Sequence, residues 1–149
     1  MDSQQAQAVV EALNSHPDGF TTVMGFVFLK ATPTEVEVEW TVGKQHLQPY
    51  GIVHGGVHAG VVESVCSVGA GLAAADRGLT GGVVGLENHT SFLRAVREGT
   101  KLRARATPVT RGSTTQVWQA EVRDQAGQLI ATGSVRLLCT PKLGRNQQP

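Results

Sequence analysis

Glu63 is the residue of this 149-residue chain whose surroundings most clearly suggest chemistry. It lies in an apolar run, residues 60–66, where an unpaired buried carboxylate would be costly. Ser67 follows one helical turn later, so its hydroxyl could hold the carboxylate or a water molecule beside it. A glutamate in a helix is more often solvated, but these neighbours favour a general base or a nucleophile.

Two consecutive glycines, Gly55 and Gly56, precede that run and follow His54. At a helix start their backbone N–H groups would be unpaired, and they would present the positive end of the helix dipole to a developing oxyanion. A glycine pair can equally serve a tight turn alone, and a histidine there more often orders the loop than acts as a base. Together with Glu63, the pattern favours a site that activates a carbonyl group, with His54 in an orienting role.

A long helix is expected to carry these residues, from residue 56 to about residue 75. Its apolar residues recur at spacings of three and four, namely Val57, Val61, Val65, Val68 and Leu72. Gly60, Gly69 and Gly71 each disfavour a helix by about 1 kcal/mol relative to alanine. Close packing against a sheet is the expected reason for these glycines.

Strands are expected on both sides of this helix. Residues 23–30 are apolar, residues 31–34 are turn-like, and residues 35–42 alternate between apolar and polar side chains as a half-buried strand does. Residues 82–139 are strand-like, with breaks near 97–99, 111–112 and 124–127, and such short connections favour antiparallel hairpins. With a short amphipathic helix at about 4–14 and a frayed tail at about 141–149, the pattern predicts a single α+β domain, residues 1–149.

Charge and cysteine content argue against several classes of protein. Lysine and arginine total 13 against 12 acidic residues without a basic run, so no nucleic-acid partner is expected. The two cysteines, Cys66 and Cys139, suggest neither a disulfide framework nor a metal site, and Cys66 is expected in the core rather than as a nucleophile. The N-terminus lacks a leader pattern and no window approaches about 20 apolar residues, so we expect no membrane partner and a cytoplasmic location.

Four separated motifs occur in the order typical of one enzyme family: residues 50–56 (YGIVHGG), Glu63, residues 88–94 (NHTSFLR) and residues 111–115 (RGSTT). Over about residues 26–138 the chain resembles hot-dog thioesterases of the 4-hydroxybenzoyl-CoA and phenylacetic acid degradation type. The resemblance implies an antiparallel sheet wrapped around a long central helix. It also implies homodimers that join edge to edge with shared active sites, and usually a dimer of dimers.

The resemblance also implies roles for individual residues. Glu63 would be the base or nucleophile, the Gly55 N–H would polarise the thioester carbonyl with help from Gln48, and Ser67 fills a position often held by threonine. His54, beside Gly55, is the remaining candidate on the catalytic side. The candidates on the substrate-binding side are Gly56, Asn88, His89, Arg94, Ser113 and Thr114. Arg94, Ser113 and Thr114 would lie toward the pantetheine and nucleotide of CoA, although without the resemblance they would be ordinary strand residues. His58 inherits no role.

The expected function is hydrolysis of an acyl-CoA, with an aryl, arylacetyl or medium-chain acyl group, to a carboxylic acid and free CoA. No cofactor is expected, because the thiolate leaves readily and CoA is part of the substrate. A non-catalytic acyl-CoA-binding protein is an alternative, but it would not need Glu63. A hydratase or dehydratase would need a carboxylate paired with His54, and none occurs between Trp40 and Val62.

Overall fold

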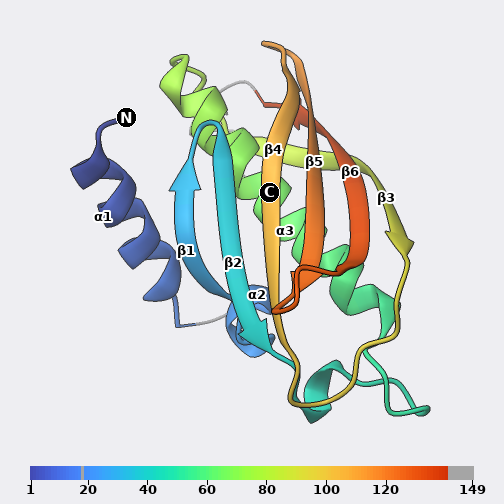
Figure 1. Ribbon diagram of the computed structural model, residues 1–149. Helices are drawn as coiled ribbons and strands as arrows, with labels where there is room; N and C mark the ends of the chain where they lie inside the picture. The colour runs from blue at the N-terminus through green and yellow to red at the C-terminus, as the bar shows by residue number, and fades with distance from the viewer. Residues whose placement is uncertain (18, 141–149) are drawn as a thin grey trace.

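Six antiparallel strands form one sheet in the order β1-β2-β4-β5-β6-β3 in the computed structural model, which describes residues 1–17 and 19–140 (Figure 1). The strands are β1 (Val27–Thr32), β2 (Glu35–Thr41), β3 (Val83–Phe92), β4 (Lys101–Arg111), β5 (Thr115–Asp124) and β6 (Leu129–Cys139). The helices are α1 (Ser3–Asn14), α2 (Phe20–Val23) and α3 (Gly55–Asp76), with the short 3-10 helix η1 (Lys44–His46) between β2 and α3. The predicted α+β layout is confirmed.

The central helix α3 packs against one face of the sheet and contacts every strand. The small side chains of α3 allow the helix to approach the sheet closely. At two of its glycines, an aromatic ring fills the space that a Cβ would take. A Cβ at Gly69 would lie 2.5 Å from the Trp118 ring, and one at Gly60 would overlap the Phe20 ring. The expected packing reason therefore holds for Gly60 and Gly69, whereas Gly71 has only ordinary space around it.

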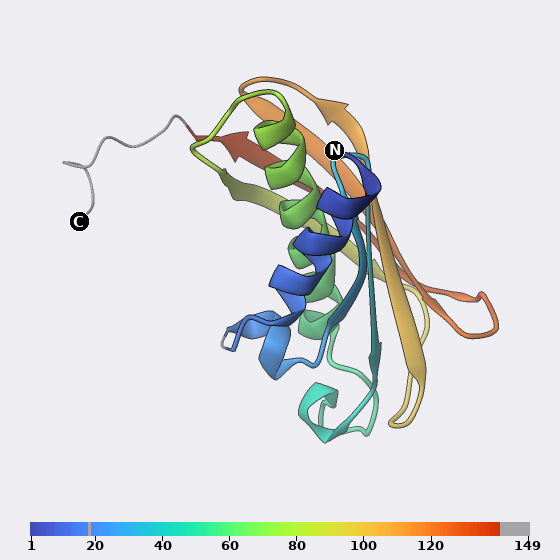
Figure 2. The same cartoon turned by 90° about the vertical axis from the view of Figure 1, so that its left-hand side faces the viewer.

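The helix α1 lies along the β1 edge of the sheet, as the view turned by 90° shows (Figure 2). Asp2 and Gln5 cap its start by exchanging side-chain to backbone hydrogen bonds of 2.8 and 2.9 Å. At its end the Asn14 amide donates to the Phe28 carbonyl at 2.9 Å and accepts from the Phe28 N–H at 2.8 Å. These two bonds attach α1 to β1 and partly cover that edge.

Two sequence expectations near β1 are wrong in detail. Residues 23–30 were expected to be a strand, but the short helix α2 ends at Val23 and Gly25, at φ +66°, turns the chain before β1 begins. The expected turn at residues 31–34 is confined to residues 33 and 34, because Ala31 and Thr32 pair with β2. The predicted tail at about 141–149 lies outside the described residues.

The expectation that no stretch resembles a membrane span is also wrong. By length and composition α3 is apolar enough to cross a membrane, and it is the one such helix in the described part of the chain. More than half of that stretch is buried against the sheet, as in the core helix of a soluble protein. A single helix of this kind is weak evidence for a membrane protein.

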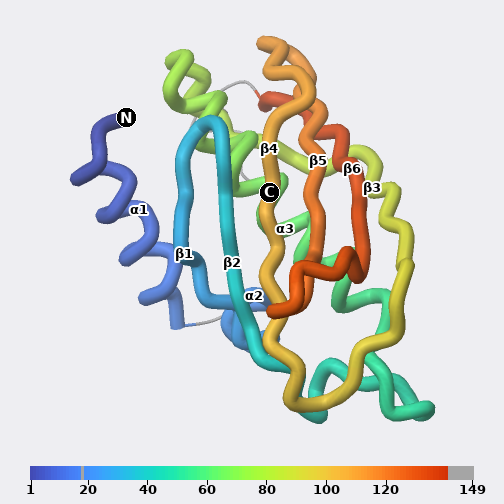
Figure 3. Tube along the Cα trace, viewed as in Figure 1, coloured from blue at the N-terminus to red at the C-terminus, as the bar shows by residue number. Residues whose placement is uncertain are grey.

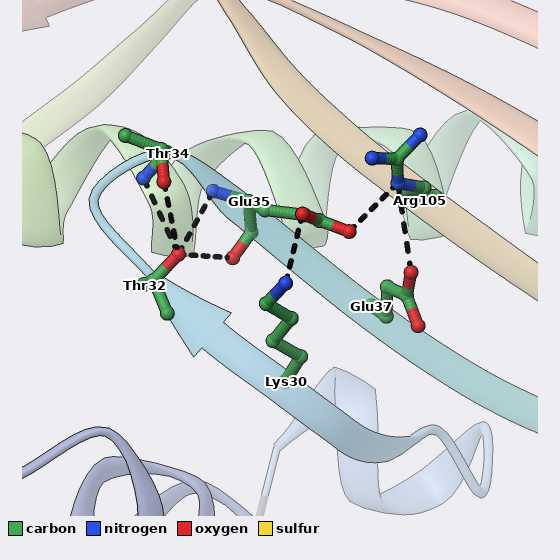
Figure 4. A network of polar contacts seen from close by, with 6 residues as sticks. All are labelled: Lys30, Thr32, Thr34, Glu35, Glu37 and Arg105. Carbon is green, nitrogen blue, oxygen red and sulfur yellow. Dashed lines mark hydrogen bonds and ion pairs between the residues drawn. The ribbon is translucent and has the colours of Figure 1, made fainter. Parts of the chain in front are cut away.

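The outer face of the sheet carries a network of ion pairs across β1, β2 and β4 (Figure 4). Arg105 contacts Glu35 at 2.7 Å and Glu37 at 3.5 Å, and Lys30 contacts Glu35 at 2.8 Å. Hydrogen bonds from Arg105 and then Lys30 lower the pKa of Glu35 from 4.5 to about 2. The alternate residues of β2 face the core, so this strand separates a charged face from an apolar one.

Candidate active site

The start of α3 is shaped by His54, its N-cap residue. The Nδ1 atom of His54 accepts a hydrogen bond of 2.8 Å from the Gly56 N–H. A Cβ at Gly56 would lie 2.9 Å from that nitrogen, so glycine permits the cap. The geometry agrees with an orienting role for His54. The Gly56 N–H is used in this hydrogen bond within the protein.

The loop before α3 is held against the connection from β3 to β4, and the two segments run side by side at one end of the molecule (Figure 3). The Val53 N–H donates to the Val96 carbonyl at 2.8 Å, and the His54 N–H donates to the His46 carbonyl at 2.8 Å. Gly51 turns the loop at φ +74°, a conformation that side chains with a Cβ rarely adopt. The loop thus enters the helix in a fixed geometry.

A pocket lies between this loop, the start of α3 and the end of β3. It brings together three predicted residues, Gln48, Gly55 and Arg94, with apolar side chains and with His58. The Phe92 ring covers Gly55, where an added Cβ would lie 2.7 Å from it, so a larger residue there would have to displace this ring. The pocket therefore contains a helix N-terminus, an amide side chain and an arginine side chain.

Glu63 lies elsewhere on α3, eight residues beyond Gly55, which corresponds to about 12 Å along the helix. Its carboxylate is half-buried and accepts hydrogen bonds from the Ser67 hydroxyl at 3.3 Å and from the Asn88 amide at 3.0 Å. The contact predicted from the Ser67 spacing is present. Within one chain, the carboxylate and the Gly55 N–H are too far apart to act on one carbonyl group.

Asn88, expected on the substrate-binding side, connects Glu63 to β3. Its amide also donates to the Ala59 carbonyl at 3.1 Å, while its oxygen accepts from the Thr90 hydroxyl at 2.7 Å. Opposite the carboxylate, a Cβ at Gly85 would overlap Glu63 Oε1, so the missing side chain leaves the space that this oxygen occupies. Sequence reasoning missed Gly85 and the contact between Asn88 and Glu63.

Three further candidates, in the described part of the chain, neither line the pocket nor contact the Glu63 carboxylate. His89 is exposed on β3 and contacts Glu87 at 2.7 Å, which lowers the pKa of Glu87. Ser113 and Thr114 are exposed between β4 and β5, next to Arg111, whose carbonyl accepts a hydrogen bond from Arg77 at the C-terminal end of α3. They lie at the opposite end of α3 from Gly55, so one chain does not bring them to the pocket.

Two titratable groups, Cys66 beside Glu63 and His58 at the pocket, have shifted pKa values. Burial, and then the charge of Glu63, raises the pKa of the Cys66 thiol, which opposes its use as a nucleophile. Burial lowers the pKa of His58 to about 4. Within residues 1–17 and 19–140, no group of three or more histidine, cysteine or acidic side chains is placed to hold a metal ion. The expected lack of a cofactor stays a prediction.

The strand β3, which carries Asn88, forms an open edge of the sheet. Within the described residues it pairs with β6 alone, and nearly all of its side chains are exposed. Several are large and apolar, including those of the segment that follows: Val84, Leu86, Phe92 and Leu93. Such an edge is a template for pairing with another strand.

Known proteins match the chain across this region. The profile of the thioesterase superfamily matches residues 50–131, which include Gly55, Glu63 and β3. The chain belongs to the thioesterase superfamily. Escherichia coli K12 1,4-dihydroxy-2-naphthoyl-CoA hydrolase is 34% identical over 126 residues, which cover 83% of this chain and 88% of that protein.

Two solved structures agree with this assignment. S. sahachiroi AziG superposes with a TM-score of 0.79 at 41% identity, covering 85% of this chain and 99% of AziG. Thioesterase HI1161 of Haemophilus influenzae gives a TM-score of 0.80 at 29% identity, covering 93% and 94%. Thioesterase superfamily membership confirms the expected hot-dog fold and the expected enzyme class, thioester hydrolase.

Proposed function

We propose that this thioesterase superfamily member hydrolyses an acyl-CoA, with Glu63 as its catalytic carboxylate. The environment of Glu63 carries the proposal. Its carboxylate is half-buried, and its hydrogen-bond donors in the described part of the chain are a hydroxyl and an amide, with no cation among them. Neutral donors orient the carboxylate without neutralising its charge, so it stays able to accept a proton or to attack a carbonyl carbon.

The carbonyl group of the thioester would bind at the start of α3. The Gly55 N–H and the Gln48 amide are the donors there, and the Gly55 N–H adds the positive end of the helix dipole. Glu63 either takes a proton from the attacking water or attacks the carbonyl carbon to form a mixed anhydride that water then cleaves. In both routes the carbon–sulfur bond breaks and CoA leaves as the thiolate.

The two halves of the site are proposed to meet in a homodimer. The distance of about 12 Å between Gly55 and Glu63 along α3 is too large for one substrate carbonyl, and the open β3 edge offers a place for a second chain. Pairing of two β3 edges would let Gln48 and Gly55 of one chain face Glu63 and Ser67 of the other, with two equivalent sites. A dimer of dimers is the proposed larger assembly.

The CoA portion would extend from this shared site toward polar side chains. Arg94, exposed at the pocket, is the proposed phosphate contact. Ser113 and Thr114 can reach the same substrate only from another subunit, because they lie at the far end of α3. Among the aryl, arylacetyl and medium-chain acyl groups, the name of the Escherichia coli relative favours an aryl group.

The direct test is thiol release from a panel of aryl-, arylacetyl- and medium-chain acyl-CoAs, ranked by kcat/KM. We expect turnover of at least one class, and a weaker kcat/KM for the same acyl group on a pantetheine fragment, because remote binding energy is lost. Tight binding of acyl-CoAs without any turnover would instead identify a non-catalytic binding protein.

The shared site is tested by mixing two inactive chains, Glu63→Ala and Gln48→Ala. Refolding equal amounts should give about half heterodimers, each with one intact site, and activity should return to about a quarter of wild type. If the Gln48→Ala homodimer is inactive and verified heterodimers show no gain, both residues serve one chain and the shared site is wrong.

A further inference from the structure

His58 is a buried polar residue in the pocket that the proposed mechanism does not use. It lies one turn beyond Gly55 on α3, is 2% exposed, and lines the pocket together with Gln48, Gly55 and Phe92. Its ring is tilted by 34° to the Phe92 ring, with 6.3 Å between the ring centroids. It therefore lies beside the place proposed for the thioester carbonyl.

The Nδ1 atom of His58 has no hydrogen-bond partner among the described residues. Buried polar atoms in proteins are nearly always hydrogen-bonded, and an unpaired one is costly. A valine or leucine would fill this part of α3 without that cost, as the neighbouring buried residues Val57, Val61 and Val62 do. Because His58 also lines the pocket, its unpaired nitrogen is a candidate hydrogen-bonding group for a ligand that the chain itself does not supply.

The protonation state limits what that group can be. Burial lowers the pKa of His58 to about 4, so the ring is neutral near pH 7, with one nitrogen that donates and one that accepts. A neutral ring cannot form an ion pair with a carboxylate or phosphate. It suits a neutral substituent, and a hydroxyl fits either tautomer because it both donates and accepts.

We infer that His58 is a specificity-determining residue that hydrogen-bonds a hydroxyl on the acyl group, close to the thioester carbonyl. The inference rests on the proposed function. His58 is three residues from Gly55, about 4.5 Å along the helix, so the hydroxyl must lie only a few bonds from the carbonyl carbon. The apolar side chains around it, Ile52, Phe92 and Leu93, suit an aromatic ring. A 2-hydroxyaryl thioester meets both conditions.

The test compares 2-hydroxybenzoyl-CoA with benzoyl-CoA, which differ by that hydroxyl alone. For the wild type we expect kcat/KM to favour the hydroxylated substrate by about tenfold. His58→Phe should remove most of this preference while changing kcat/KM for benzoyl-CoA by less than about threefold. His58→Gln, whose amide can donate and accept, should retain part of the preference and provides a second variant if phenylalanine does not fit.

Three outcomes would overturn the inference. A wild type without a preference would do so, as would an equal loss on both substrates in His58→Phe, which would indicate a structural role. An unchanged preference in His58→Phe together with a weakened dimer, measured by size-exclusion chromatography, would assign the nitrogen to a contact with a partner subunit.

Failure of the proposed function is distinguishable from failure of this inference. If the wild type hydrolyses neither substrate, calorimetric binding of the same two CoA thioesters gives the preference directly. A tenfold binding preference that is lost in His58→Phe would then support His58 as the specificity residue, although hydrolysis has failed. Equal binding of both thioesters would reject it.

Discussion

Glu35 and Glu39 on the outer face of the sheet each contact two cationic side chains, whereas the described contacts of Glu63 on α3 are an amide and a hydroxyl. The cations hold the β2 carboxylates in their ionised form and lower their pKa values, with Arg105 first for Glu35 and Lys101 first for Glu39. An ion-paired carboxylate is a weak base with occupied oxygens. The kind of partner, rather than the presence of a charge, thus distinguishes these ion-paired glutamates from Glu63, the proposed catalytic carboxylate.

Among changes to the neighbours of Glu63, the largest effect should come from Gly85→Ala. A Cβ at this position would overlap Glu63 Oε1, and the carboxylate would move while the strand stays in place. A displacement of about 1 Å can cost roughly 10²-fold in rate, so we expect kcat to fall by about that factor with little change in Tm. Gly71→Ala is the matched control, because its added Cβ would meet only Val83 at 3.9 Å. Full activity in Gly85→Ala would show that the position of this carboxylate is unimportant.

Asn88→Ala should have the next largest effect. It removes the 3.0 Å hydrogen bond to Glu63, and a bond to a charged group contributes about 1.5–3 kcal/mol. We therefore expect kcat/KM to fall by about tenfold or more, measured by thiol release. Gln119→Ala removes an exposed amide from β5 and should leave turnover unchanged. Equal activity in the two variants would mean that Asn88 does not orient the carboxylate.

Ser67→Ala should be milder still. The hydroxyl donates to Glu63 Oε1 at 3.3 Å, which is long for such a bond, so its loss should cost about 1 kcal/mol, roughly fivefold in kcat. Steady-state kinetics at saturating substrate checks this value. A loss as severe as that of Glu63→Ala would require a direct catalytic role for the serine.

The smallest effect should come from the other side of the comparison, Glu35→Gln, and it should concern stability alone. The pKa of Glu35 is about 2 in the folded protein against an ordinary 4.5, so its contribution is complete above about pH 4.5 and is lost as the pH falls toward 2. We expect a loss of about 1 kcal/mol or less at pH 7, a smaller difference at pH 3, and unchanged kcat. Urea unfolding at the two pH values measures both differences. A difference that grows at pH 3 would contradict this assignment.

Local patterns in the sequence predicted the parts of the site that lie on one element. The valine spacing of α3 predicted that helix, and the one-turn spacing of Ser67 predicted its contact with Glu63. The glycine pair after His54 predicted a helix start with an orienting histidine. In each case the geometry of a helix determines the contact.

Contacts between distant elements could not be predicted in this way. The contacts of Gly85 and Asn88 with Glu63 depend on β3 pairing with β6 at the sheet edge and on the register of β3 against α3, which no local pattern specifies. The helix α2 was missed because its apolar residues extend the pattern of β1, and the Phe20 ring packs on a glycine 40 residues later. The unpaired His58 nitrogen likewise became visible only with the pocket around it.

The most direct test of the proposed function is to compare kcat for Glu63→Gln and Glu37→Gln on the best acyl-CoA substrate. Both changes replace a carboxylate by an amide of the same shape, one beside neutral donors and the other 3.5 Å from Arg105. We predict that Glu63→Gln loses about 10²–10⁴-fold in kcat while Glu37→Gln stays within about twofold of wild type. A Glu63→Gln enzyme that keeps more than about a tenth of wild-type kcat would contradict the role of Glu63 as the catalytic carboxylate.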